Sequence, residues 1–394
     1  MGFVCVTERP SVPGTNVLED LRRLAEAGVR IFPEVCLTQP LPKGVWSKFV
    51  DTVLLARAEA LLPGAGQAAR LERVLNGWVP DAVLTIWSER ATALASTLTC
   101  RKLAYYGNPD HKVAAAGAEF EWRMSERSAR DLVLYIRRWF RAWLIRRAHL
   151  RVMRGYDGVG DVALNDADFY RAHGVRGAFY IPNMWHQKAG ADWETRRDRL
   201  EVVRPLRIVG NVGSLRGTGN GLGLHTLATQ IVPALRNRLG ERAFQVHVFG
   251  GGEPHPAISK LLLDPHVVLR GFVDDLDSEI LVAPVFLVAN NNSRFRVGHT
   301  RFLHAWSLGA CVIAFRGSAE AMPELEHGVN ALLASTPREM AELTAMAAAD
   351  AGLRRRLGRA GYRTLSEKFS PDTVTKLLIA RLAGTVRSSV DGAT

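Results

Sequence analysis

Cysteine, lysine and long apolar runs are all scarce in this chain of 394 residues. Its four cysteines lie far apart and form no CxxC pair, which argues against a disulfide framework or a cysteine-based metal site. No uninterrupted apolar run reaches the roughly 20 residues that a membrane-spanning helix needs. These absences indicate a globular, cytoplasmic protein with reduced cysteines.

Negative charge is also in short supply. The formal net charge is +12, and only eight of the 51 basic residues are lysines, so arginine supplies most of the positive charge. This balance favours an anionic partner. No zinc finger, aromatic RNA-binding signature or helix-turn-helix is present, so nucleic acid is not the expected partner. An anionic membrane surface or a phosphate-bearing substrate remains.

Apolar strands alternate with helices along the whole chain, which predicts an α/β fold with parallel sheets. A polar, charge-rich segment interrupts the alternation before a second series of strands begins at residue 206. We expect two Rossmann-like domains facing a cleft, at residues 1–187 and 205–370, with a linker at 188–204 and a crossover helix and tail at 371–394. In such sheets ligands bind at the carboxyl ends of the strands.

A glycine-rich turn follows the first strand of the second series. Residues 210–217 read GNVGSLRG, and three further glycines, Gly219, Gly221 and Gly223, are expected ahead of a helix. Glycines let the backbone approach a ligand, and a helix N-terminus favours phosphate. Gly213, Ser214 and Arg216 are therefore candidate phosphate ligands. The alternative is a flexible surface loop with an ordinary arginine.

Several blocks of this half resemble family-4 glycosyltransferases of GT-B fold. The resemblance runs over residues 155–385 and is carried by the turn at 210–217, GFVDDL at 271–276, the helix-glycine-strand block at 301–314, and EKFS at 367–370. It implies the GT-B fold, a nucleotide-sugar donor, retention of configuration, and no cofactor or metal. The acidic run at 274–277 is interpreted as a helix-capping turn.

The chain departs from that family at charged positions. Arg216 falls on the family's lysine, and Asn211 on its arginine. Arg301 falls on the basic position of the "K-x-x-E-A" motif, His304 on the second glutamate, and Arg296 on the first. A neutral histidine accepts one hydrogen bond and an arginine only donates. The resemblance therefore implies a charged or differently held donor, or loss of activity.

One acidic residue beyond this motif is a further donor candidate. Pro323-Glu324 resembles a glutamate near the family's donor. Glu324 is expected to bind sugar or ribose; the alternative is a carboxylate stabilised by the dipole at a helix N-terminus. For His304, the alternative is a helix residue that contacts no ligand.

Two loops of the first half are candidates for the other side of the cleft. Gly14 and Thr15 follow the first strand and resemble the loop that touches the donor phosphate. Asp110 and His111 follow a later strand, where the family places acceptor-facing residues. In a retaining reaction the departing phosphate itself can take the acceptor proton. The alternative for His111 is an exposed loop histidine.

Residues 130–154 predict a helix with one apolar face and many arginines, and no acidic residue lies between Asp131 and Asp157. The candidate membrane contacts are Trp139, Phe140, Trp143, Arg137, Arg138 and Arg141. Arginines beside tryptophans suit the surface of an anionic bilayer. The alternative is an ordinary helix whose apolar face joins the core.

These patterns predict a glycosyltransferase that moves a sugar from a nucleotide-activated donor to a glycan or lipid-linked acceptor. The expected setting is surface polysaccharide or glycolipid assembly of the bacterial type, at the inner face of the membrane. The alternative is a non-catalytic protein of the same fold that binds a glycan or a partner transferase. A sugar-nucleotide epimerase is less favoured, because it needs several cleft carboxylates that the sequence does not place.

Overall fold

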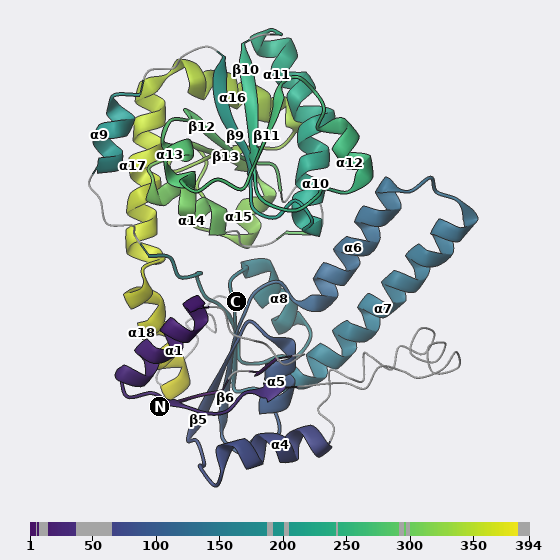
Figure 1. Ribbon diagram of the computed structural model, residues 1–394, viewed down its shortest axis with the longest axis vertical. Helices are drawn as coiled ribbons and strands as arrows, with labels where there is room; N and C mark the ends of the chain where they lie inside the picture. Colours follow the sequence, from purple (N-terminus) through teal and green to yellow (C-terminus); the bar gives the residue numbers. More distant parts are fainter. Residues whose placement is uncertain are drawn as a thin grey trace, which may run out of the picture.

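The computed structural model describes residues 1–4, 6–7, 15–36, 65–186, 192–200, 205–241, 243–290, 295–296 and 300–384. Two α/β domains lie one above the other, and the C-terminal helices run along one side of both (Figure 1). Gly14 lies outside the described residues, and of Thr15 only its place at the start of a helix is described. No helix of the described part is long and apolar enough to cross a membrane.

The first domain is built on parallel strands. Its main sheet has the order β5-β6-β7-β8, with β5 at Ala82–Ile86, β6 at Arg101–Tyr106, β7 at Gly158–Asp161 and β8 at Ala178–Tyr180. Two short parallel pairs precede it: β1 (Gly2–Phe3) with β3 (Arg30–Ile31), and β2 (Val6–Thr7) with β4 (Val35–Cys36). The helices are α1 (Thr15–Glu26), α4 (Ala65–Leu75), α5 (Glu89–Ala95), α6 (Asp110–Met124), α7 (Ala129–Met153) and α8 (Leu164–Ala172).

The second domain holds a six-stranded parallel sheet of order β11-β10-β9-β12-β13-β14. The strands are β9 (Leu206–Val212), β10 (Phe244–Phe249), β11 (Val267–Gly271), β12 (Val285–Val288), β13 (Val312–Phe315) and β14 (Leu332–Ala334). This is the doubly wound order 3-2-1-4-5-6. The strands all run parallel, but the order in which the chain adds them reverses between β9 and β12. A ligand crevice is therefore expected where those two strands end.

Helices cover both faces of this sheet, over two separate buried apolar clusters. They are α10 (Thr218–Thr226), a π-helical turn (Leu227–Ile231), α11 (Val232–Leu239), α12 (Pro256–Leu261), α13 (Leu276–Leu281), α14 (Thr300–Ser307), α15 (Gly317–Ala321), α16 (Pro337–Ala349) and α17 (Ala351–Lys368). The prediction of two Rossmann-like α/β domains is confirmed.

The segment expected as a linker contains a docked helix, α9 (Asp192–Asp198). Trp193 is buried against Gly309, where a Cβ would lie 1.9 Å from the indole ring. Arg197 donates to the backbone oxygens of Ile280, Ala283 and Leu308 at 2.7–3.1 Å. The sequence analysis did not predict this helix, because a charge-rich segment is typical of a linker. Here one of the charged residues, Arg197, fixes the helix to the second domain.

The last helix, α18 (Pro371–Ala383), returns to the first domain as expected. Its Val374 and Leu378 are buried in one apolar cluster with Leu103 and Tyr105 of β6. Ser370 caps it by accepting a hydrogen bond from the N–H of Thr373. In Figure 1 α17 and α18 form the yellow run that spans both domains.

Helix α6 also joins the two domains. Its Phe120 is buried in an apolar cluster of the second domain and meets the ring of His255 edge-on at 5.4 Å. A Cβ on Gly221 would lie 2.8 Å from the Phe120 ring. The glycine set expected ahead of a helix therefore lies inside α10, and at Gly221 the missing side chain admits α6.

Candidate functional site

Two glycines, each directly after a strand, shape the turn that follows β9. Gly213 has a φ of 117° and Gly250, after β10, has a φ of 138°, both in a region that side-chain-bearing residues rarely adopt. A Cβ on Gly250 would lie 2.0 Å from the carbonyl oxygen of Gly213. This close packing brings the turn to the carboxyl edge of the sheet, beside the point where the strand order reverses.

Arg301, in the first turn of α14, lies against this turn. Its Nη1 donates to Asn290 Oδ1 at 2.7 Å and to Asn211 Oδ1 at 3.4 Å, and its Nη2 donates to Asn220 Oδ1 at 2.5 Å. Burial lowers the pKa of Arg301 to about 10, so the guanidinium stays cationic at neutral pH. Among the described residues its partners are neutral amides, which leave a positive charge to be balanced.

The three asparagines are themselves oriented by the backbone. The amide groups of Asn290 and Asn220 donate to the carbonyl oxygens of Gly219 and Ser214 at 2.7 and 2.6 Å. Asn211 donates in the same way to the oxygen of Gly213 at 3.3 Å. Each amide therefore turns its oxygen toward the guanidinium. Sequence reasoning named Asn211 only as a departure from an expected arginine, and it missed Asn220 and Asn290, which flank the glycine-rich turn and β12.

Ser214 and Arg216 form the outer part of the same turn. Both are exposed, and the Arg216 N–H donates to Ser214 Oγ at 3.4 Å. The Arg216 side chain passes over Gly252, where a Cβ would lie 3.0 Å from Arg216 Cγ. The structure thus brings Gly213, Ser214, Arg216 and Arg301 together, with one arginine inside the turn and one on its surface.

His304 lies one helical turn beyond Arg301 and contacts two other elements. Its Nε2 is 2.7 Å from Asp277 Oδ1 of α13, and its ring is 5.6 Å from that of Trp185. The neighbouring Asp275 caps α13 by accepting from the N–H of Ser278 at 3.0 Å. The interpretation of the acidic run as a helix-capping turn is confirmed. Among the described residues no three His, Cys, Asp or Glu converge as a metal site.

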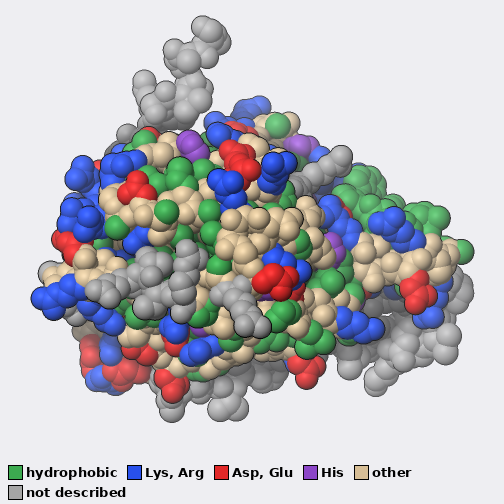
Figure 2. All heavy atoms as spheres, turned by 90° about the horizontal axis from the view of Figure 1, so that it is seen from above, with side chains coloured by type: hydrophobic (Ala, Val, Ile, Leu, Met, Phe, Trp, Pro, Cys, Tyr) green, Lys and Arg blue, Asp and Glu red, His purple; other side chains and the backbone are tan. Residues whose placement is uncertain are grey.

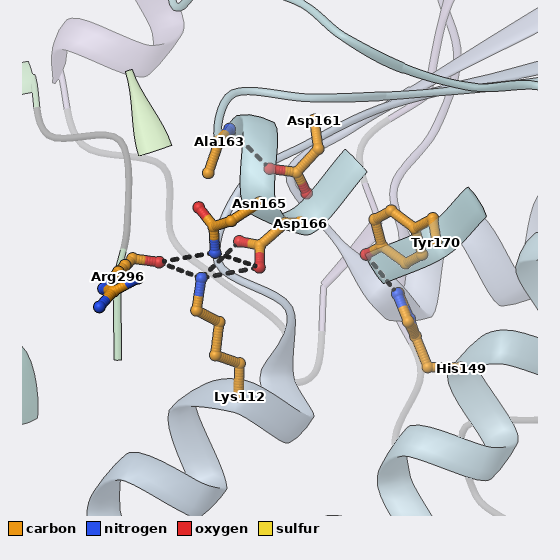
Figure 3. A network of polar contacts seen from close by, with 8 residues as sticks. All are labelled: Lys112, His149, Asp161, Ala163, Asn165, Asp166, Tyr170 and Arg296. Atoms are coloured by element: carbon orange, nitrogen blue, oxygen red, sulfur yellow. Dashed lines mark hydrogen bonds and ion pairs between the residues drawn. The ribbon is translucent and has the colours of Figure 1, made fainter. Parts of the chain in front are cut away.

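Arg296 lies between the domains. Its side chain forms an ion pair with Glu320 of α15, and its carbonyl oxygen accepts from Lys112 Nζ and, at 3.4 Å, from Asn165 (Figure 3). Lys112 also pairs with Asp166 of α8 at 2.6 Å. The residue on the first glutamate position therefore serves a contact between the domains.

A second polar contact between the domains involves Glu324. The hydroxyl of Tyr180, the last residue of β8, donates to Glu324 Oε2 at 2.8 Å. Burial raises the pKa of Glu324, and the hydrogen bond from Tyr180 opposes that rise. The carboxyl expected near the donor is thus already oriented by the first domain.

Asp110 and His111 begin α6, at the carboxyl edge of the first sheet. Asp110 is exposed, and its N–H donates to Glu89 Oε1 at 2.6 Å. His111 packs 5.8 Å from the ring of His149 and 5.1 Å from that of Phe169. Burial lowers the pKa of His111 to about 3, so this imidazole is neutral at physiological pH.

Three buried carboxyls at this edge escaped the sequence reasoning. Glu89 begins α5, Asp161 ends β7 and Asp166 lies in the first turn of α8; all are at most 6% exposed. Burial raises the pKa of Glu89 to about 8 and that of Asp161 well above its usual value. The signal was available, because each follows or ends an apolar strand, where site residues of parallel sheets gather.

Helix α7 carries the predicted membrane contacts at a distance from the cleft. Its exposed apolar side chains are Leu132, Val133, Ile136, Trp139, Phe140 and Trp143. Arg137, Arg138 and Arg141 are all exposed, and Arg138 Nη1 lies 3.4 Å from Glu121 Oε2 of α6. Figure 2 shows hydrophobic side chains gathered on the projection at the right, where Figure 1 places the α6–α7 hairpin.

Comparison with known proteins agrees with this architecture. Residues 207–350 match the family model of glycosyl transferases group 1. No curated protein matches the chain.

Three solved structures are similar over nearly the whole chain. The Anabaena protein HepE, crystallised with UDP and glucose, is 13% identical, with a TM-score of 0.59 over 96% of this chain and 99% of that one. Sucrose-phosphate synthase of Thermosynechococcus elongatus is 14% identical, with a TM-score of 0.60 over 97% and 99%. The α,α-trehalose 6-phosphate synthase of Burkholderia multivorans is 13% identical, with a TM-score of 0.60 over 97% and 98%.

At these identities the structural likeness shows the fold, and the family match covers the second domain. The chain thus carries a domain that matches glycosyl transferases group 1 at residues 207–350, and as a whole it has the two-domain GT-B fold.

Proposed function

We propose that this enzyme transfers a sugar from a nucleoside diphosphate sugar to a glycan or lipid-linked acceptor. The observation that carries the proposal is Arg301, a cation held by three asparagine oxygens against the turn after β9. A guanidinium with neutral partners attracts an anion, and a diphosphate matches its forked geometry. HepE, which has the same fold, was crystallised with UDP and glucose, which supports a nucleotide donor here.

The turn offers the diphosphate more than one charge. Arg216 is exposed on the surface of the turn, and the N-terminus of α10 follows it directly. Backbone N–H groups at a helix start add donors for phosphate oxygens. Two arginines and a helix N-terminus would stabilise the departing nucleoside diphosphate, so we propose that the transfer does not depend on a metal.

The first domain would bind the acceptor. Its edge presents Asp110 at the surface, and the imidazole of His111 is neutral because its pKa is held near 3. Such a histidine is a weak base. It suits a reaction in which the departing phosphate removes the acceptor proton on the same face as the new bond, with retention of configuration.

We also propose that α7 holds the enzyme on an anionic membrane surface, where a lipid-linked acceptor of surface polysaccharide or glycolipid assembly would lie. Trp139, Phe140 and Trp143 are 39–47% exposed, and the Arg147 guanidinium lies 4.9 Å from the Trp143 ring centre. Exposed aromatics would enter the headgroup region while flanking arginines meet anionic lipid. A core role for this face does not fit its exposure.

Thermal shift with nucleoside diphosphates and their sugar conjugates tests the donor. Nucleotides carrying one particular base should raise the melting temperature of the wild type. Arg216→Ala should reduce this shift, because an exposed positive charge on the turn after β9 is lost. Arg338→Ala, which removes an exposed arginine of α16, is the matched control. If no nucleotide raises the melting temperature of the wild type, the proposal fails.

Flotation with anionic and neutral vesicles tests the membrane contact. The wild type should float with anionic vesicles, and Trp139→Ser with Phe140→Ser should abolish flotation. Leu263→Ser removes an exposed apolar residue elsewhere and should leave flotation unchanged. Equal absence of the wild type from both vesicle types would remove the membrane claim.

A further inference from the structure

Trp87 is a half-exposed aromatic residue at the carboxyl edge of the first sheet. It directly follows β5, and its N–H donates to the carbonyl oxygen of Tyr105 of β6 at 3.0 Å. The residue is 46% exposed, whereas Tyr105 is 2% exposed. Parallel α/β sheets bind their ligands at this edge. Trp87 therefore lies where a bound ligand would contact its indole ring.

The backbone of Trp87 has a conformation that tryptophan rarely adopts. Its φ is 54°, in the left-handed region. Asn108, which follows β6, has a similar φ of 57°, but asparagine tolerates this region because its short side chain can hydrogen-bond locally. Bulky residues with such a φ gather at active sites and ligand contacts. Glycine would adopt this φ without strain, so a half-exposed tryptophan here points to a use for its ring.

Two contacts fix the indole ring of Trp87. The rings of Trp87 and Tyr105 meet edge-on, with their centroids 6.3 Å apart. A Cβ on Gly107 would lie 2.9 Å from Trp87 Cη2, so the absence of a side chain at Gly107 makes room for the indole. The ring is therefore held in place by the protein while nearly half of the residue stays open to solvent.

The loop that carries Trp87 is joined to the loop that carries Asp110. Glu89, two residues after Trp87, accepts a hydrogen bond from the N–H of Asp110 at 2.6 Å. The strands that precede these loops are neighbours, with Ile86 paired to Tyr105. Trp87 and the exposed Asp110 thus lie on adjacent, connected loops at the edge proposed to bind the acceptor.

An aromatic face near an aspartate matches the chemistry of a sugar ring. The face of an indole carries partial negative charge, which attracts the C–H groups of a ligand. A pyranose presents C–H groups on the face of its ring and hydroxyls around its rim, and the carboxyl oxygens of an aspartate accept hydrogen bonds from hydroxyls. A lipid chain offers no hydroxyl to Asp110, and a phosphate offers no C–H face to Trp87.

We infer that a pyranose ring of the acceptor stacks on Trp87, so the acceptor is a glycoside and not a bare lipid. The inference rests on the proposed function and deepens it by naming the class of acceptor. A tryptophan that only packed the first domain would contact no sugar, and this difference can be measured.

Fluorine NMR of the full-length enzyme labelled with fluorotryptophan tests the contact. Trp87→Phe removes one resonance and so assigns it. Trp78→Phe assigns the control, a tryptophan of the same domain that is 37% exposed and packs 5.3 Å from the ring of Phe32. The probes are the methyl pyranosides of glucose, galactose, mannose and N-acetylglucosamine, with glycerol as a polyol without a ring. At least one pyranoside should shift the Trp87 resonance saturably, whereas glycerol should not, and the Trp78 resonance should stay unchanged.

The strength of binding gives a second measurement, which does not need the Trp87 resonance. Ligand-observed NMR yields the dissociation constant of the pyranoside that shifts Trp87. Trp87→Leu should raise this constant about tenfold, because an aromatic stacking contact is lost. Trp78→Leu should leave it unchanged. Both variants should still be stabilised by the nucleotide that stabilises the wild type, which shows that each is folded.

The outcomes separate this inference from the proposed function. If a nucleotide stabilises the wild type but no pyranoside shifts the Trp87 resonance, the inference alone fails. A Trp87 resonance that moves with a nucleotide and with no pyranoside would assign the indole to the donor, which also overturns the inference. A wild type that no nucleotide stabilises would overturn the proposed function, and with it the assignment of Trp87 to an acceptor.

Discussion

The carboxyl edges of the two sheets face each other but carry opposite chemistry. On the second domain, a cationic Arg301 is held by three neutral asparagines. On the first domain, Glu89, Asp161 and Asp166 are buried, and burial raises the pKa of each. One edge thus holds a charge ready for an anion, and the other keeps its carboxyls largely hydrogen-bonded within the protein. The same strand-loop-helix plan thus presents a cation at one edge and buried carboxyls with raised pKa values at the other.

Removing the charge from the second edge should have the largest effect. Arg301→Gln keeps hydrogen-bonding capacity for the asparagine cage but loses the cation. We expect nucleoside diphosphate affinity to fall on the order of 100-fold, since charge-assisted hydrogen bonds contribute roughly 1.5–3 kcal/mol. Calorimetry measures it, with Arg338→Gln as the control. An unchanged dissociation constant would show that the edge does not bind phosphate through Arg301.

The first edge should respond to pH. Burial raises the pKa of Glu89 to about 8 in the folded protein, whereas the ordinary value, expected in the unfolded chain, is 4.5. The folded state therefore favours the protonated carboxyl. Such a raised pKa contributes stability that is present below the unfolded value and is lost as pH rises from about 4.5 to about 8. Glu89→Gln removes this loss.

Denaturation of the wild type and Glu89→Gln at pH 5 and pH 8.5 measures that difference. The variant should gain on the order of 2–4 kcal/mol relative to the wild type between the two pH values. Glu72→Gln, an exposed glutamate of α4, should follow the wild type. Parallel pH profiles for wild type and Glu89→Gln would mean that Glu89 is ionised in the fold.

Removing the hydrogen bond between Tyr180 and Glu324, which joins the two domains, should have the smallest effect. Tyr180→Phe removes the hydroxyl that donates to Glu324 across the domains. A lost hydrogen bond of this kind costs about 1 kcal/mol, or roughly fivefold in sugar-nucleotide affinity, if closure and donor binding are coupled. Tyr105→Phe on β6 of the same sheet, whose hydroxyl donates to Asn183 of its own domain, is the control. Identical Michaelis constants for both variants would separate the Tyr180 contact from donor binding.

Local signals predicted much of this fold. The second series of strands from residue 206 and the crossover helix from residue 371 were predicted from apolar runs and a motif, because these features depend on neighbouring residues. Arg301 and the turn at Gly213 were also predicted, from a glycine pattern and a resemblance. The prediction placed them near a ligand, and the structure brings them into contact.

What the sequence concealed depends on residues far apart in the chain. Helix α9 owes its place to Arg197, whose partners are backbone carbonyls about 80 to 110 residues away. The asparagine cage combines amides from three segments, and the buried carboxyls come from α5, β7 and α8. A local pattern can place a carboxyl at the end of a strand, but its burial and its partners are set by tertiary packing.

The contact of Phe120 with Gly221 limits how the two domains can be recombined. Helix α6 begins in the first domain, yet its aromatic ring fills part of the second domain's core, in space that any side chain at residue 221 would occupy. A chimera that takes a foreign donor domain must therefore bring a small residue at the same place on its first helix. A larger residue there would clash with the Phe120 ring, and the two domains of the chimera would not pack together.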